Sequence, residues 1–245
     1  MSDVLLQEKH GRVLRLTLNR PSALNALNNE LTQALVDALA AADRDQSVGA
    51  VLLCAAGRAF CAGADIKELA ATTSGGPRLG AIRADLTASL HLAFTKVSVP
   101  IVSAVNGVAV GGGCGVAVAA DLVVAAESAR FGYPEIKRGA VAAIVMAMLV
   151  RLVGRKAAYE MIALGEVVDA HQARMLGLVS RVVPDEKLQE AAMAMATTLA
   201  GFDHDASRAT KRLFQRTADL PFPQAIEASR DANLIMRGYS IRTTV

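Results

Sequence analysis

The chain opens with short apolar runs and then changes to a helical spacing of apolar residues. Two runs rich in leucine and β-branched residues, 4–7 and 13–18, flank His10-Gly11 and predict a β-hairpin. Over residues 28–43 the apolar side chains recur at intervals of three and four, which predicts an amphipathic helix covering a sheet. The expected buried face of that helix consists of Leu31, Ala34, Leu35, Ala38, Leu39 and Ala42.

Strand-like and helix-like patterns alternate along the middle of the chain. Strands are expected at 50–54, 101–105, 122–126 and around 130–131, and helices at 114–120, 140–153 and 155–163. This alternation is typical of an α/β fold with largely parallel sheets covered on both faces. Beyond Pro184 the pattern is purely helical. The last helices are expected at 186–200, 207–217 and 223–237.

Composition narrows the choice of partners. A chain of 245 residues with 53% hydrophobic content is long enough for one large core. Its 26 basic and 23 acidic residues are spread along the sequence and aromatic residues make up only 4%, so nucleic acid is not expected as a partner. The uncharged stretch 97–120 is long enough to span a membrane, but Pro100, Asn106 and five glycines favour a buried strand, a turn and a helix.

The N-terminus and the cysteines indicate a cytoplasmic protein. Charged residues interrupt the apolar residues of the first segment, so we expect no signal peptide. Three cysteines without CxxC spacing suit neither a disulfide framework nor a zinc site. The four histidines, His10, His91, His171 and His204, show no ligand spacing, so no metal site is expected.

Two glycine-containing turns, 58–68 and 106–115, each follow an expected buried strand. Small residues let a ligand approach the main chain closely, and the second turn opens a helix whose first N–H groups are unpaired. Two such N–H donors on one oxygen would form an oxyanion hole. Ordinary loops are the alternative. A dinucleotide-binding GxGxxG motif fails because Val116 stands at its last glycine, and no GK[ST] follows for a phosphate-binding loop.

Five segments occur in an order that resembles the enoyl-CoA hydratase/isomerase family, also called the crotonase superfamily, over residues 16–184. They are NRPSALNAL (19–27), FCAGADIKE (60–68), PIVSAVNGVAVGGGC (100–114), FGYPEIKRG (131–139) and ARMLGLVSRVVP (173–184). The resemblance implies a crotonase-like spiral of β-β-α units over residues 1–190. Residues 191–245 would form a helical C-terminal region on the oligomerisation side of the same domain. It also implies a homotrimer or a dimer of trimers.

The resemblance assigns roles to particular residues. The backbone N–H groups of Ala64 and Gly112 would be the oxyanion donors, and Glu135 would be the acid/base. The substrate would be an acyl-CoA thioester, with no cofactor besides its coenzyme A and no metal. The substrate-binding residues it implies are Ala26, Ala64, Asp65, Ile66, Lys67 and Gly112.

These roles are chemically consistent. A hydrogen next to a thioester carbonyl leaves only if the enolate is stabilised and a carboxylate accepts the proton. Apolar neighbours would desolvate Glu135 and raise its pKa. The alternative is a surface glutamate paired with Lys137 or Arg138. Cys61 and Cys114 flank the proposed hole without a histidine beside them in sequence, so we expect them to pack in the core.

The main departure from the family is Gly115, which stands where well-known hydratases carry a second glutamate. One carboxylate suffices for double-bond isomerisation, whereas hydration would lack one of the two carboxylates that hold and activate the water. Isomerisation is therefore favoured over hydration. The alternatives are a 2-enoyl-CoA hydratase and a catalytically weakened acyl-CoA-binding homologue. A nicotinamide-dependent oxidoreductase is disfavoured by the failed GxGxxG motif. We expect Gly115→Glu to place a second carboxylate opposite Glu135, provided that the larger side chain fits without overpacking.

Two further departures concern binding of coenzyme A. Ser22 replaces a lysine that many relatives carry in the early loop. The chain ends with Ser240-Ile241-Arg242-Thr243-Thr244-Val245, without the Phe-containing segment and KRxP-like motif usual in relatives. If that segment helps to build the site of a neighbouring subunit, its loss weakens affinity or assembly.

Overall fold

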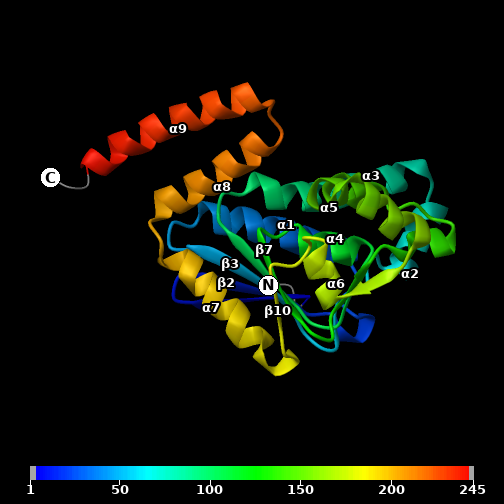
Figure 1. The fold of residues 1–245 in the computed structure, drawn as a ribbon. Coiled ribbons are helices and arrows are strands. Elements are labelled where there is room, and N and C mark those ends of the chain that lie inside the picture. The colour runs from blue at the N-terminus through cyan, green and yellow to red at the C-terminus, as the bar shows by residue number, and fades with distance from the viewer. Residues whose placement is uncertain (1–3, 243–245) are drawn as a thin grey trace.

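Within residues 4–242, which the computed structural model describes, six strands form the central sheet (Figure 1). The predicted hairpin is present as an antiparallel pair, and the four later strands run parallel to its second strand. The sheet order is β1 (Leu5–His10), β2 (Val13–Leu18), β3 (Ala50–Ala55), β5 (Ile101–Val105), β7 (Leu122–Ala126) and β10 (Arg181–Val183). The expected α/β class is therefore confirmed.

The described residues also hold a smaller sheet of four strands, of which only the one near residue 130 was expected. In sheet order they are β4 (Ala59–Cys61), β6 (Val108–Val110), β8 (Arg130–Gly132) and β9 (Val167–Asp169). The pairs β3–β4, β5–β6 and β7–β8 each give one strand to each sheet. A helical element follows each pair: α2 (Ile66–Ser74), α4 (Gly112–Val118) and the 3₁₀ helix η2 (Pro134–Arg138). The chain is thus built of β-β-α units, as the resemblance implied.

Side chains of the central sheet alternate between two apolar layers. In β3, Val51 and Leu53 belong to the main core with α1 (Asn29–Arg44). Ala50, Leu52 and Cys54 face α7 (Leu188–Gly201) on the other side. This period of two follows from the pleat of a strand and confirms that the sheet is covered on both faces.

The predicted helix near residue 28 is α1, which the Asn28 side chain caps by accepting a hydrogen bond from the Leu31 N–H (2.9 Å). The two helices expected at 140–163 form one element, α5 (Ala143–Leu164), broken at Gly154, where φ is 74°. Sequence analysis missed α2 and α3 (Pro77–Lys96). In α3 the burial of apolar residues changes along the helix, since Leu79 and Ile82 near its start are exposed while Leu90 and Phe94 near its end are buried.

The remaining helical elements are the 3₁₀ turns η1 (Pro21–Ala23) and η3 (Asp185–Lys187), and the helices α6 (Ala170–Met175), α8 (His204–Ala218) and α9 (Phe222–Arg242). Figure 1 shows α8 and α9 extending from one end of the molecule, with α9 well away from the sheet. The expected boundary after residue 190 falls inside α7. Thr243–Val245, at the unusual C-terminus, lie outside the described residues.

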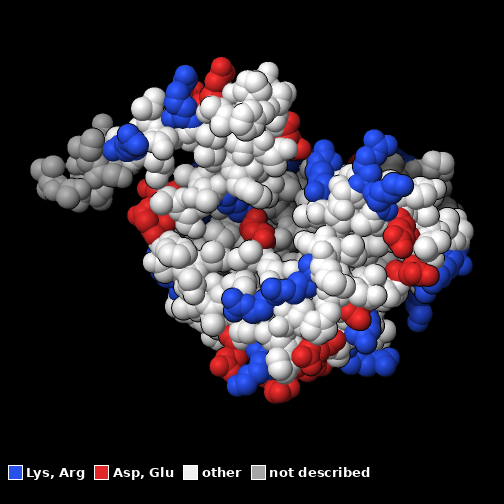
Figure 2. Space-filling view, in the orientation of Figure 1, with Lys and Arg blue, Asp and Glu red and all other residues white. Residues whose placement is uncertain are grey.

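The outer surface carries mixed charge. Figure 2 shows Lys and Arg interspersed with Asp and Glu over the face of the molecule that it presents. Among the described residues, no helix combines the length and the apolar character that crossing a membrane requires. The uncharged stretch at 97–120 instead forms the expected strand β5 and helix α4, with the short strand β6, which was not expected, between them.

Two buried cations attach α8 to the body of the protein. Arg208 donates hydrogen bonds to the Asp43 carboxylate (2.9 Å) and the Ser98 hydroxyl (3.0 Å). Lys211 forms an ion pair with Asp121 (2.7 Å) and donates to the Val99 carbonyl (3.1 Å). Burial lowers the pKa of Lys211, and the Asp121 carboxylate opposes this effect. The attachment of α8 therefore depends on charge pairs as well as on apolar contact.

We expect Asp121→Asn to lower the free energy of unfolding by about 3 kcal/mol, because it leaves the buried Lys211 ammonium without its countercharge. Lys211→Met is the matched control, since it removes the buried charge and keeps a long side chain. Its effect should be clearly smaller, because Asp121 is the more exposed partner and still accepts a hydrogen bond from the Ile101 N–H. Urea unfolding of both variants measures this. An equal or larger loss in Lys211→Met would contradict it.

Candidate functional site

The three expected catalytic residues lie just beyond the ends of three adjacent strands of the smaller sheet. Ala64 follows β4 by three residues, Gly112 follows β6 by two, and Glu135 follows β8 by three. These strands are neighbours and run parallel. Because the carboxyl ends of parallel strands meet at one edge of a sheet, the three residues come together although 71 positions separate the first from the last.

The N–H groups of Ala64 and Gly112 are free to bind a ligand. Leu27 pairs with the chain on either side of Ala64, donating to the Gly63 carbonyl (2.7 Å) and accepting from the Asp65 N–H (3.0 Å). In such a parallel bridge the N–H of Ala64 itself points away from Leu27. Gly112 is the first residue of α4, where N–H groups have no partner within the helix. No backbone carbonyl of the described residues accepts a hydrogen bond from either group.

Glycines allow the two turns to pack against each other through their main chains. Gly63 has a φ of 90°, and a Cβ added to it would lie 2.9 Å from the Val110 carbonyl oxygen and 3.6 Å from the Gly112 nitrogen. A Cβ on Gly113 would lie 2.3 Å from the Cys61 carbonyl oxygen. Any larger residue would separate the turns, so glycine at 63 and 113 fixes the spacing of the two donors.

Glu135 is half-buried beside the start of α4. A Cβ added to Gly111 would lie 2.8 Å from Glu135 Oε1, and Oε2 is buried without a hydrogen-bond partner among the described residues. Desolvation raises the pKa of Glu135 above its ordinary value, while a backbone hydrogen bond and the charge of Arg138 oppose this in part. Glu135 forms no ion pair with Lys137 or Arg138. The alternative of a paired surface glutamate is therefore wrong.

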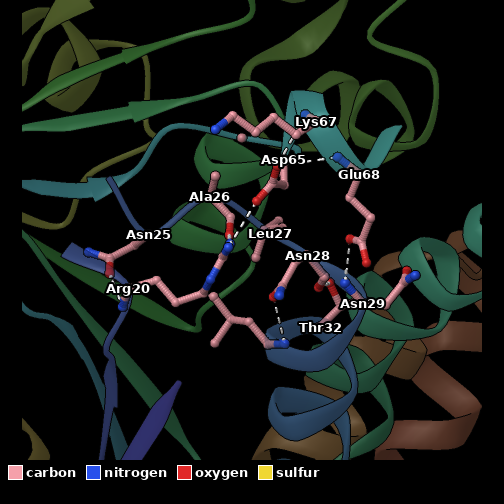
Figure 3. Close-up of polar contacts among 12 residues, drawn as sticks. Arg20, Asn25, Ala26, Leu27, Asn28, Asn29, Thr32, Asp65, Lys67 and Glu68 are labelled. Carbon is pink, nitrogen blue, oxygen red and sulfur yellow. Dashed lines mark hydrogen bonds and ion pairs between the residues drawn. The ribbon is translucent and has the colours of Figure 1, made fainter. Parts of the chain in front are cut away.

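The loop after β2 holds the first turn in place (Figure 3). Arg20 donates hydrogen bonds to the Ala26 carbonyl and to the Asp65 carboxylate (2.9 Å), which joins two expected substrate-binding residues. Asn25 is buried in a left-handed conformation (φ 55°), and its side-chain amide donates to the carbonyls of Ala56 (2.8 Å) and Ala59 (2.9 Å). Strain of this kind persists only where the surroundings fix the backbone. Sequence analysis missed both Arg20 and Asn25 as site-forming residues.

Asp65 also caps α2. Its carboxylate accepts hydrogen bonds from the N–H groups of Lys67 (3.1 Å) and Glu68 (3.4 Å). The Arg20 hydrogen bond is the main cause of the lowered pKa of Asp65. Ile66 and Lys67 are exposed on the first turn of α2. The structure thus gathers Ala26 and residues 64–67 into one ledge beside the Ala64 N–H.

The cysteines beside the site pack in the core, as expected. Cys61 and Cys114 are fully buried, and burial raises the pKa of each thiol to about 12. Neither thiol is ionised at neutral pH, so neither is an activated nucleophile.

Gly115 lies in the first turns of α4, as expected, but the condition that a glutamate there fits without overpacking is not met. A Cβ at Gly115 would lie 2.5 Å from Val145 Cγ1 and 2.6 Å from His91 Cε1. Those distances are shorter than real contacts, so Gly115→Glu would overpack the site before its carboxylate could face Glu135. Sequence analysis gave His91 no role, because the only signal was one histidine within a helix that its pattern does not reveal.

Comparisons with known proteins agree with this geometry. The family model described as enoyl-CoA hydratase/isomerase matches residues 8–235. A Rhizobium meliloti protein named "Probable enoyl-CoA hydratase" is 39% identical over 230 residues, which are 93% of this chain and 87% of that protein. The Escherichia coli 2,3-dehydroadipyl-CoA hydratase is 39% identical over 227 residues, covering 92% of this chain and 87% of the relative.

Solved structures show the same fold. The crystal structure of an enoyl-CoA hydratase from Mycobacterium smegmatis superposes with a TM-score of 0.91 at 35% identity, covering 96% of this chain and 91% of the other. A structure from Legionella pneumophila, titled as an enoyl-CoA hydratase/isomerase (crotonase), gives a TM-score of 0.89 at 31% identity and covers 96% of this chain and 90% of its own. The spiral of β-β-α units is thus the crotonase fold.

Proposed function

This chain belongs to the enoyl-CoA hydratase/isomerase family, and from that membership we propose that it adds water to a 2-enoyl-CoA thioester through an enolate. The observation that carries the proposal is the meeting of two unpaired main-chain N–H groups, on Ala64 and Gly112, with the half-buried carboxylate of Glu135. An enolate needs donors at its oxygen and a group that moves a proton at carbon, and these three residues supply both.

In the proposed reaction, the thioester oxygen accepts hydrogen bonds from Ala64 and Gly112. The Glu135 carboxylate removes a proton from water as the water oxygen bonds to C3. The C2=C3 electron pair moves towards C2 and the carbonyl, and the two N–H groups stabilise the negative charge that develops on the thioester oxygen. Glu135 then returns the proton to C2. Water has been added across the double bond, and the carboxylate is regenerated.

Isomerisation is the second candidate. It would use the same N–H donors, with Glu135 removing a proton at C2 of a 3-enoyl-CoA and returning one at C4. Gly115 favours it because no second carboxylate lies beside Glu135 from that position. The compared relatives with a single named activity are hydratases, which favours hydration. The isomerase preference drawn from Gly115 stays a prediction.

Coenzyme A would bind along the ledge formed by Ala26, Asp65, Ile66 and Lys67. The Arg20 bridge holds the Ala26 carbonyl and the Asp65 carboxylate at a fixed separation. We propose that this rigidity serves the adenine and pantetheine portion, with the exposed Lys67 ammonium available to a phosphate. Coenzyme A arrives as part of the substrate, so the reaction needs no further cofactor.

Glu135→Gln keeps the shape but removes the proton acceptor, so turnover of a short 2-enoyl-CoA should fall by about 10²–10⁴ with little change in binding. In the parent, kcat/KM should fall as the pH drops through the raised pKa of Glu135, because only the ionised carboxylate accepts the proton. Product mass separates the two reactions, because hydration adds one water to the thioester and isomerisation leaves its composition unchanged.

A parent that binds the thioester but neither hydrates nor isomerises it would be the acyl-CoA-binding homologue. A parent that isomerises a 3-enoyl-CoA and leaves a 2-enoyl-CoA unhydrated would overturn the preference for hydration. Undiminished turnover in Glu135→Gln would exclude Glu135 as the acid/base.

Gly112 allows a matched test of the oxyanion hole. Gly112→Pro removes the N–H at the first helical position, where proline is well tolerated, so turnover should drop by about 10²–10³ while the fold is kept. Gly112→Ala retains the N–H, and its Cβ would meet only Leu27 Cδ1, at 3.4 Å. Its turnover should stay near the parent value. Equal activities in the two variants would rule out the Gly112 N–H as a donor.

We also propose that copies of the chain associate through the α8–α9 arm into a trimer or a dimer of trimers. On α9, which packs chiefly against α8, Phe222, Ile226 and Leu234 are exposed. An apolar surface of this kind is unfavourable in water unless another surface covers it.

Light scattering of the parent should give the mass of three or six chains. Ile226→Glu should reduce this mass, whereas the control Gln224→Glu should not. A parent with the mass of one chain would contradict this.

A further inference from the structure

His91 fills the place that a side chain at position 115 would occupy. It lies on α3, and the ring atom nearest to Gly115 is Cε1, which is bonded to both ring nitrogens. Its distance from a Cβ added to Gly115 would be 2.6 Å. The polar end of the imidazole therefore faces the first turns of α4, beside the proposed oxyanion hole.

The imidazole is buried but incompletely bonded. His91 is 8% exposed, and its Nε2 has no hydrogen-bond partner among the described residues. A buried ring nitrogen without a partner is unfavourable in a folded protein, and such groups often serve a ligand or a reaction. Desolvation lowers the pKa of His91 to about 4, so the ring is neutral at pH 7 and one nitrogen can accept a hydrogen bond.

Glu135 lies beside Gly111, which precedes Gly115 by one helical turn. A Cβ added to Gly111 would lie 2.8 Å from Glu135 Oε1, and the Gly111 carbonyl accepts a hydrogen bond from the Gly115 N–H (3.0 Å). Glu135 Oε2 is likewise buried without a partner among the described residues. Two unsatisfied polar groups, from α3 and from η2, thus lie beside the start of α4.

From this arrangement we infer that His91 positions the water for hydration. It takes the role that Gly115, which has no side chain, cannot fill. The inference rests on the proposed function. Nε2 accepts a hydrogen bond from one O–H of the water, while Glu135 removes the proton of the other O–H as the oxygen bonds to C3. His91 gains and loses no proton. It acts by orienting the lone pair of the water towards C3.

This role separates two reactions that share one enolate. Exchange of the hydrogen at C2 of a saturated acyl-CoA needs Glu135 and the two N–H donors but no oriented water. Hydration needs all of these and His91. A purely structural role for His91 would change both rates together, because both depend on the same packed turns.

The test measures both rates in the parent, His91→Phe and His91→Gln. Hydration is followed with a short 2-enoyl-CoA, and exchange at C2 with a short saturated acyl-CoA in heavy water. His91→Phe keeps a planar ring, so hydration should fall by about tenfold to a hundredfold while exchange changes by less than about threefold. His91→Gln keeps a hydrogen-bonding group and should recover part of the lost hydration.

Val145→Ala is the matched control, because Val145 touches the same position without a polar atom, and any effect it has should be shared by both rates. Hydration by His91→Phe at the parent rate would overturn the inference, and so would an equal fall in hydration and exchange. If His91→Phe does not fold, His91→Leu is judged by the same ratio. If the parent exchanges the hydrogen at C2 but does not hydrate the 2-enoyl-CoA, both the proposed hydration and this role of His91 are overturned. If the parent does neither, the proposed function as a whole is overturned.

Discussion

A Cβ on Gly113 would lie 2.3 Å from the carbonyl oxygen of Cys61, so the main chain of Gly113 packs directly against Cys61 and no side chain fits between the turns after β4 and β6. This contact sets the distance between the N–H groups of Ala64 and Gly112, and neither group can be moved by a change of rotamer. The smaller sheet brings the turns to one edge, and the glycines at 63 and 113 let them close. Other parts of the site are arranged around that fixed pair of donors.

Polar side chains of neighbouring segments hold the main-chain turns of the site in place. Arg20 connects the Ala26 carbonyl to the Asp65 carboxylate, while the buried amide of Asn25 holds the loop after β2 against the carbonyls of Ala56 and Ala59. The same logic recurs at the other end of the molecule, where Arg208 and Lys211 attach α8. Buried charge in this protein therefore serves mainly to fix where one segment lies on another.

Much of the fold could be predicted from the sequence where burial is one-sided and the element is long. The bounds of β5 and β7 were predicted correctly, and α1 to within one residue, because their apolar residues follow a clear period. The three-residue strands β4 and β6 are too short to show alternation. The motifs predicted which residues would form the site. The roles of Arg20 and His91 could not be found, since Asp65 and Gly115, beside which they lie, are more than 20 positions away in the sequence.

Because the oxyanion donors are main-chain groups, the atoms that bind the thioester oxygen differ from the side chains that determine the product. Side-chain substitution cannot delete the N–H of Ala64 or Gly112, except by proline, so recognition of a thioester oxygen tolerates wide change elsewhere. The fate of the enolate instead depends on the few side chains that face the start of α4 from α3, η2 and α5, namely His91, Glu135 and Val145. To alter the product, His91 and Val145 are therefore best substituted together, because both side chains occupy the space beside Gly115. The thioester-binding turns are left unchanged.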